Sequence, residues 1–235
     1  LDFADVKTPN HAFKRVVRDL EFDVAELAIV TFLMAKAHAK PLVLMPAVIL
    51  SRYQHPYLVY NAERGPLAPA DLAGRRVGIR SYSVTTATWI RGILATDYGL
   101  HLDSVRWVTF EEPHVAEYRD PPNVERAAPG RDLLDMLLNG EVDAAVVAAI
   151  PADPRLKPLI PEPAVAARAW RERNQALQIN HMLVVRESLS AANPEAVREV
   201  YRMLVESKRA AGPQAAHDFD LNPFGVEANR RSLEV

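Results

Sequence analysis

Short apolar runs alternate with amphipathic stretches along this chain, and proline, glycine or aspartate bounds most of the runs. Several runs are rich in β-branched residues and have the length of buried strands. The predicted strands lie at 43–45, 58–60, 76–79, 105–108, 143–147 and 182–185. The pattern therefore predicts a sheet whose strands are separated by other elements.

Amphipathic stretches between these runs have apolar residues at helical spacing. One predicted helix begins at Asn10, and Phe13, Val16, Val17 and Leu20 would share one face. Further helices are predicted at 86–98, 133–138 and 193–212, and surface loops at the proline-rich segments 113–129 and 151–163. Strands that alternate with helices favour an α/β protein with a largely parallel, doubly wound sheet.

Composition narrows the class of protein only a little. The chain has 235 residues, 49% of them hydrophobic and 25% charged, which suits one large domain or two small lobes. A formal net charge of -2 argues against nucleic-acid binding. The chain has no cysteine, which excludes disulfides and thiolate metal sites and leaves the compartment open.

The apolar runs are all far shorter than the ~20 residues that a membrane-spanning helix needs. No signal peptide is visible, so a cytoplasmic location is expected, or a periplasmic one if a preceding segment carries a signal peptide. The chain begins at Leu1 inside an apolar segment and stops at Val235. We expect the natural protein to continue beyond both ends.

A turn rich in hydroxyl groups, Tyr82-Ser83-Val84-Thr85-Thr86, follows the predicted strand 76–79 and opens a helix. Backbone amides at a helix N-terminus, together with nearby hydroxyl groups, form a favourable site for an anion. Alternatively, Ser83 or Thr85 merely caps the helix. The sequence leaves both interpretations open.

Four phrases carry a resemblance to a known family: 21–27, Ser51-Arg52-Tyr53-Gln54-His55, 69–78 and 82–94. The chain resembles the 4,5-dihydroxyphthalate decarboxylase family, and further matches lie at Trp107, at His181 and at 222–225 with Asn229. The resemblance implies an α/β, two-lobed fold of the type II periplasmic-binding-protein kind. Each lobe would hold a mostly parallel sheet flanked by helices, with the ligand cleft between the lobes.

The resemblance also implies where one lobe ends and the other begins. The chain differs from the family pattern in two segments. Lobe one would comprise residues 1–68 and 182–235, and lobe two residues 69–181. Two segments depart from the family pattern: Arg80-Ser81-Tyr82 stands where Pro-Glu-Tyr is usual, and Phe110-Glu111-Glu112 stands where Gly-Gly is usual. Both departures fall near the expected cleft, so they bear on the substrate more than on the fold.

A decarboxylase of this family needs an acid aimed at the carboxyl-bearing ring carbon, an acceptor for the para hydroxyl, and a cation for the retained carboxylate. The resemblance implies His55 and His181 as catalytic residues. The predicted binding residues for a small anionic aromatic substrate are Ser51, Arg52, Tyr82, Ser83, Thr85, Trp107 and Glu112. Glu112 lies in a segment that departs from the family pattern, and it is predicted from the chemistry as an acceptor for a ring hydroxyl. This chemistry demands no organic cofactor.

Each of these residues also has a simpler interpretation. Histidine and tryptophan often pack in cores, so His181 and Trp107 could be structural, and an Arg-x-x-His pattern is common on surfaces. The seven histidines show no compact ligand spacing, so no metal site is predicted. A different class of function also stays open, that of a solute-binding protein that delivers a carboxylate to a transporter permease.

Overall fold

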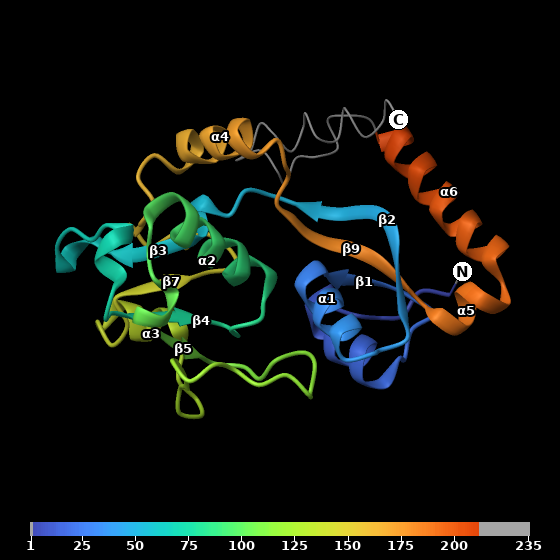
Figure 1. Ribbon diagram of the computed structural model, residues 1–235, viewed down its shortest axis with the longest axis horizontal. Coiled ribbons are helices and arrows are strands. Elements are labelled where there is room, and N and C mark those ends of the chain that lie inside the picture. Colours follow the sequence, from blue (N-terminus) through green and yellow to red (C-terminus); the bar gives the residue numbers. More distant parts are fainter. Residues whose placement is uncertain (1, 212–235) are drawn as a thin grey trace. The chain divides into compact units, whose positions relative to one another are not determined.

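Apolar residues at strand spacing build two separate sheets, one in each of two compact units. The computed structural model describes residues 2–211. Within that range, unit one comprises the residues up to Arg52, His114–Glu117 and the residues from Leu177 onward, and unit two comprises Tyr53–Pro113 and Tyr118–Ala176. Figure 1 labels most of the helices and strands of both units.

Unit two contains a six-stranded sheet with the order β6-β5-β4-β7-β3-β8. Its strands are β3 (Leu58–Asn61), β4 (Arg76–Ile79), β5 (Arg106–Thr109), β6 (Val124–Arg126), β7 (Ala144–Val146) and β8 (Leu156–Pro158). The four strands β6, β5, β4 and β7 run parallel, and β3 pairs antiparallel with β7 and β8. The predicted parallel arrangement is therefore confirmed for the centre of this sheet.

Alternate residues of these strands face opposite sides, which creates two cores. The helices of unit two are α2 (Thr85–Tyr98), α3 (Leu133–Leu138) and α4 (Pro163–Asn174). One core joins Ile90 and Leu94 of α2 to Trp107 of β5, and the other joins Leu137 of α3 to Val108 of β5. Helices α2 and α3 thus cover opposite faces, as in a doubly wound sheet.

Unit one contains β1 (Val24–Ala28), α1 (Ile29–Ala37), β2 (Leu42–Ser51), β9 (Ile179–Arg186), α5 (Glu187–Ala192) and α6 (Pro194–Ala211). Its three-stranded sheet has the order β1-β9-β2, and β9 is antiparallel to both neighbours. The expectation of a mostly parallel sheet in each lobe is wrong for this unit. Strands β1 and β2 do run in the same direction, but β9 lies between them in the opposite one.

An apolar stripe on helix α6 packs the helix against the sheet of unit one. Its residues Val197, Val200 and Leu204 pack against a small core that contains Met45 and Leu183 of the sheet. The predicted helix 193–212 is thereby confirmed over its described part. The matching segment 222–225 and Asn229 lie outside the described residues.

Short turns of helix connect the main elements. They are the 3-10 segments η1 (Pro9–His11), η3 (His55–Tyr57), η4 (Ala62–Arg64), η5 (Pro69–Leu72) and η6 (Leu102–Ser104), and the π-helical segment η2 (Arg15–Asp19). The regular helix predicted from Asn10 is thus replaced by η1 and η2. Leu20 ends η2 in the left-handed region with φ 50°.

The observed boundaries of the units differ from the predicted ones near residues 68 and 181. Residues 53–68 belong to unit two because β3 pairs with β7 and β8. Ile179 and His181 belong to unit one because they pair with β2. The segment His114–Glu117 joins unit one through a contact of 2.8 Å between Thr31 Oγ1 and His114 Nδ1.

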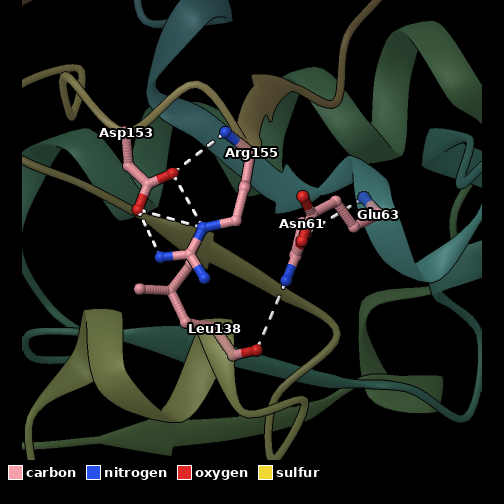
Figure 2. A network of polar contacts seen from close by, with 5 residues as sticks. All are labelled: Asn61, Glu63, Leu138, Asp153 and Arg155. Atoms are coloured by element: carbon pink, nitrogen blue, oxygen red, sulfur yellow. Dashed lines mark hydrogen bonds and ion pairs between the residues drawn. The ribbon is translucent and has the colours of Figure 1, made fainter.

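Polar contacts tie the antiparallel edge of unit two to α3 (Figure 2). The Asn61 side chain donates to the Leu138 carbonyl at 3.3 Å and accepts from the Glu63 amide at 3.1 Å. Just before β8, the Arg155 guanidinium donates to the Asp153 carboxylate at 2.6 Å. These bonds from Arg155 lower the pKa of Asp153 to about 2. Both clusters fix the loops that flank β3 and β8.

Within residues 2–211, none of the helices is both long enough and apolar enough to cross a bilayer.

Candidate functional site

A cavity of about 360 Å³ lies at the carboxyl ends of β4, β5 and β7, and it is built entirely from unit two. Ligands of open α/β sheets bind at this edge, because the strand ends and loops leave a crevice there. The lining residues are Arg80, Phe110, Glu111, Arg131, Asp132, Leu133, Leu134, Val146, Val147, Ala148 and Ala149. We call this cavity the strand-end pocket.

Charged side chains of both signs line the strand-end pocket together with apolar ones. Arg80 follows β4 directly, and its carbonyl accepts bonds from the amides of Phe110 and Glu111 at 3.0 and 2.8 Å. The Arg80 Nη1 atom lies 3.8 Å from Glu111 Oε2, which is an ion pair and not a hydrogen bond. Arg131 pairs with Glu141. The departures from the family pattern at Arg80 and Glu111 therefore line one pocket.

The turn before α2 is buried. Ser83 is 5% exposed and Thr85 3% exposed. The N-cap position falls on Val84, which has no side-chain oxygen, so neither Ser83 nor Thr85 is the N-cap residue. Among the described residues, the Ser81 hydroxyl beside them is buried and finds no hydrogen-bond partner. The turn thus keeps the polar character that an anion site requires.

The buried Arg91 of α2 holds this turn in place through hydrogen bonds and ring contacts. Its guanidinium donates to the Tyr82 carbonyl at 2.6 Å and to Thr88 Oγ1 at 3.2 Å. It also lies 3.8 Å from the centroid of the Tyr82 ring and 5.8 Å from that of Trp107. Burial lowers the pKa of Arg91, but an arginine stays charged. Tyr82, predicted as a binding residue, is therefore held in place by a buried cation.

Arg91→Met should destabilise the protein by about 2–3 kcal/mol, because it removes a charged hydrogen bond and a cation–π contact from a buried position. Urea denaturation measures this loss. Arg106→Gln is the matched control, because Arg106 is exposed on β5 and its replacement should change the free energy of unfolding by less than about 0.5 kcal/mol. Equal stability of Arg91→Met and the control would contradict the bracing role.

Trp107 lies in the core of unit two and is 0% exposed. Its ring packs edge-on against Tyr82, with centroids 6.0 Å apart, and its Nε1 donates to the Leu102 carbonyl at 3.4 Å. Of the two interpretations that the sequence left open, this placement favours core packing over stacking on a ligand.

His55 is also fully buried, at 0% exposed. Among the described residues, neither ring nitrogen has a hydrogen-bond partner. Burial lowers the pKa of His55 to about 4, partly offset by Asp97. The imidazole is therefore neutral at pH 7 and holds no transferable proton of the imidazolium kind.

His181 has a different environment, in unit one. Its Nδ1 lies 2.5 Å from Glu26 Oε1, and the two side chains are 20% and 23% exposed. In the β1–β9 register His181 faces Ala28, so Glu26 is its diagonal neighbour on the same face of the sheet. A carboxylate that accepts from Nδ1 fixes the ring and leaves Nε2 to exchange protons.

The ring of Phe13 packs against His181. The Phe13 ring meets His181 edge-on with centroids 5.2 Å apart, and it meets His114 in the same way at 5.5 Å. Phe13 and His114 are themselves buried, at 1% and 5% exposed. The Glu26–His181 pair is thus an ordered, partly exposed acid–base pair.

The remaining predicted residues are Ser51, Arg52 and Glu112. Ser51 ends β2 and donates to the Gln178 carbonyl at 3.2 Å, and the Arg52 amide bonds to the same carbonyl at 3.2 Å. Glu112 is exposed. Ser51, Arg52 and His181 belong to unit one, and the other predicted site residues belong to unit two. Their convergence on one cleft stays a prediction.

Across the described range, histidine, aspartate and glutamate side chains form no group of three that could hold a metal ion.

Reasoning from sequence missed the roles of Glu26, Arg80, Arg91 and Arg131. Glu26 lies in the first phrase that carries the family resemblance, but its partner is 155 positions away. Arg80 and Glu111 drew notice only as departures from the family pattern. Strand pairing brings Glu26 to His181 and Arg80 to Glu111.

Two curated proteins match the chain over most of its length. A 4,5-dihydroxyphthalate decarboxylase from Comamonas testosteroni is 27% identical over 225 residues, which cover 88% of this chain and 66% of that protein. A protein of the same name from Pseudomonas putida is 29% identical over 178 residues, which cover 70% of this chain and 69% of that protein. The predicted resemblance to these decarboxylases is confirmed. The chain spans about two thirds of the length of either relative.

No family model matches the chain. Among solved structures, the alkanesulfonate-binding protein SsuA from Xanthomonas axonopodis pv. citri aligns with 92% of this chain and 68% of its own, at 15% identity and a TM-score of 0.53. At that identity the likeness concerns the fold alone. It confirms the predicted periplasmic-binding-protein-like α/β fold.

Proposed function

We propose that this protein is a decarboxylase of a hydroxylated aromatic dicarboxylate similar to 4,5-dihydroxyphthalate. The match to two proteins named for that activity carries the proposal. An ordered Glu26–His181 pair and a pocket with both arginine and apolar walls are compatible with it. The proposed location is the cytoplasm.

The chemistry requires protonation of the ring before carbon dioxide leaves. Loss of carbon dioxide from the intact aromatic ring would leave a costly carbanion. Instead, the hydroxyl para to one carboxylate gives its proton to a base, and its electrons pass through the ring so that the carboxyl-bearing carbon forms a bond with a proton from the acid. The carbon–carboxylate bond then breaks, its electron pair restores the aromatic ring, and the hydroxyl recovers its proton. The net change replaces one carboxylate with hydrogen.

We propose His181 as the proton donor in these reaction steps. The Glu26 carboxylate at Nδ1 fixes the His181 ring and leaves the opposite nitrogen, Nε2, for proton transfer. His55 is less suited to the role, because its pKa of about 4 keeps it neutral. We therefore assign the acid to His181 and a neutral, buried role to His55.

The substrate class is tested by carbon dioxide release from two related dicarboxylates. The purified protein should decarboxylate 4,5-dihydroxyphthalate and leave phthalate unchanged, because phthalate has no para hydroxyl to supply electrons. If neither compound releases carbon dioxide, the proposed decarboxylation of hydroxylated aromatic dicarboxylates is refuted. Equal release from both would contradict the mechanism.

A solute-binding protein is the second candidate, favoured by the likeness of the fold to SsuA. Its ligand would be a small carboxylate, its partner a transporter permease and its location the periplasm. Tight binding of 4,5-dihydroxyphthalate without any carbon dioxide release would favour this function over the enzyme.

A further inference from the structure

The strand-end pocket combines features that together select a particular kind of ligand. Its volume of about 360 Å³ falls at the small end of the range for ligand sites, about 300–1,000 Å³. Phe110, Leu133 and Val146 supply apolar walls for a planar ring. A single aromatic ring with short substituents suits this size and polarity.

Arg80 supplies a cation that is available to a ligand. Within the described residues its guanidinium forms no hydrogen bond, and its ion pair with Glu111 is loose, at 3.8 Å. The side chain is 33% exposed, so it is partly withdrawn from water. Its planar set of donors matches a carboxylate, which would bind in a bidentate manner.

Glu111, next to Arg80 in the pocket, supplies a negative charge. A carboxylate accepts hydrogen bonds and repels other anions, so it favours a ligand hydroxyl over a second ligand carboxylate. Because the Arg80 carbonyl bonds to the Glu111 amide at 2.8 Å, the backbone fixes the two residues relative to each other. A ligand with only one of the two groups would satisfy only one of the two side chains.

We infer that the strand-end pocket recognises a hydroxylated aromatic carboxylate, with Arg80 on the carboxylate and Glu111 accepting from a ring hydroxyl. The inference deepens the proposed function, because it names residues that would select its substrate. Arg80 and Glu111 are specificity residues in this account and take no part in proton transfer.

Isothermal titration calorimetry with three non-reacting probes tests the assignment. The probes are 3,4-dihydroxybenzoate, which has both groups, benzoate, which has only the carboxylate, and catechol, which has only the hydroxyls. The protein should bind 3,4-dihydroxybenzoate about 10- to 100-fold more tightly than either partial probe, since each lost partner leaves a charged group without its hydrogen bond.

Two variants assign each half of the preference. Arg80→Gln should abolish the preference over catechol, and Glu111→Met, which leaves no side-chain acceptor, should abolish the preference over benzoate. Both variants should stay folded, because an exposed ion pair contributes little stability. Arg106→Gln, at the opposite end of β5, removes the same charge as Arg80→Gln and should leave all three affinities unchanged.

The outcomes separate this inference from the proposed function. Unchanged affinities in both pocket variants, or no binding of 3,4-dihydroxybenzoate, would overturn the pocket assignment even if the protein releases carbon dioxide from 4,5-dihydroxyphthalate. If the affinities follow the expected pattern but no carbon dioxide is released, the pocket assignment is supported and the proposed decarboxylase activity is refuted.

Discussion

Replacing His181 with glutamine is expected to lower kcat for decarboxylation of 4,5-dihydroxyphthalate by about 10²–10⁴-fold, the usual contribution of a positioned general acid. Glutamine keeps a polar side chain but cannot transfer a proton. Steady-state release of carbon dioxide measures the effect. KM should change little, because His181 is assigned to proton transfer and not to carboxylate binding.

Glu26→Gln separates positioning from proton transfer. This variant keeps the shape at Nδ1 but loses the carboxylate that orients the His181 ring. It should lower kcat by about 10–100-fold and leave KM nearly unchanged. His101→Gln, at an exposed histidine, should behave as the unaltered protein. Full activity of His181→Gln would remove His181 from the mechanism.

Acidification is expected to destabilise the protein through His55. Burial places its pKa at about 4 in the folded state, against the ordinary value of 6.5. Below about pH 6.5 the unfolded chain therefore binds a proton that the folded chain does not. The free energy of unfolding should fall by about 3 kcal/mol as the pH drops from 6.5 to 4, and then level off for this group.

His55→Leu isolates this contribution, because leucine fills a similar space and does not titrate. Urea denaturation at several pH values should give a shallower pH dependence for this variant than for the unaltered protein between pH 6.5 and 4. His101→Gln should retain the steeper dependence, since His101 is exposed. Identical curves for His55→Leu and the unaltered protein would show that His55 is not held neutral by burial.

The regular parts of the fold could be predicted because local patterns determine them. Apolar runs located β4, β5 and β7, and helical spacing with a following glycine located α2, where Gly99 adopts φ 63°. Helix α4 escaped prediction because Glu162 precedes it without a side-chain cap and only Ala167 and Trp170 of the helix are buried, which leaves a narrow apolar face. Strands β6 and β8, with three residues each, are too short to show a period.

The arrangement of the strands and the site needed tertiary information. Nothing in residues 179–186 indicates that β9 lies between β1 and β2 in the opposite direction. The same insertion brings His181 to Glu26 across the β1–β9 register. Likewise, Arg80 and Glu111 share a pocket only because β4 and β5 are parallel neighbours that end together.

Decarboxylation in heavy water tests the central claim most directly. If a protein acid protonates the carboxyl-bearing carbon, 4,5-dihydroxyphthalate should yield carbon dioxide and 3,4-dihydroxybenzoate that carries one deuterium at the carbon that lost its carboxylate. Proton nuclear magnetic resonance would detect this as the loss of one ring signal. The account predicts that labelled product forms rapidly with the unaltered protein and at least about 100-fold more slowly with His181→Gln. Recovery of unchanged 4,5-dihydroxyphthalate from the unaltered protein would contradict it.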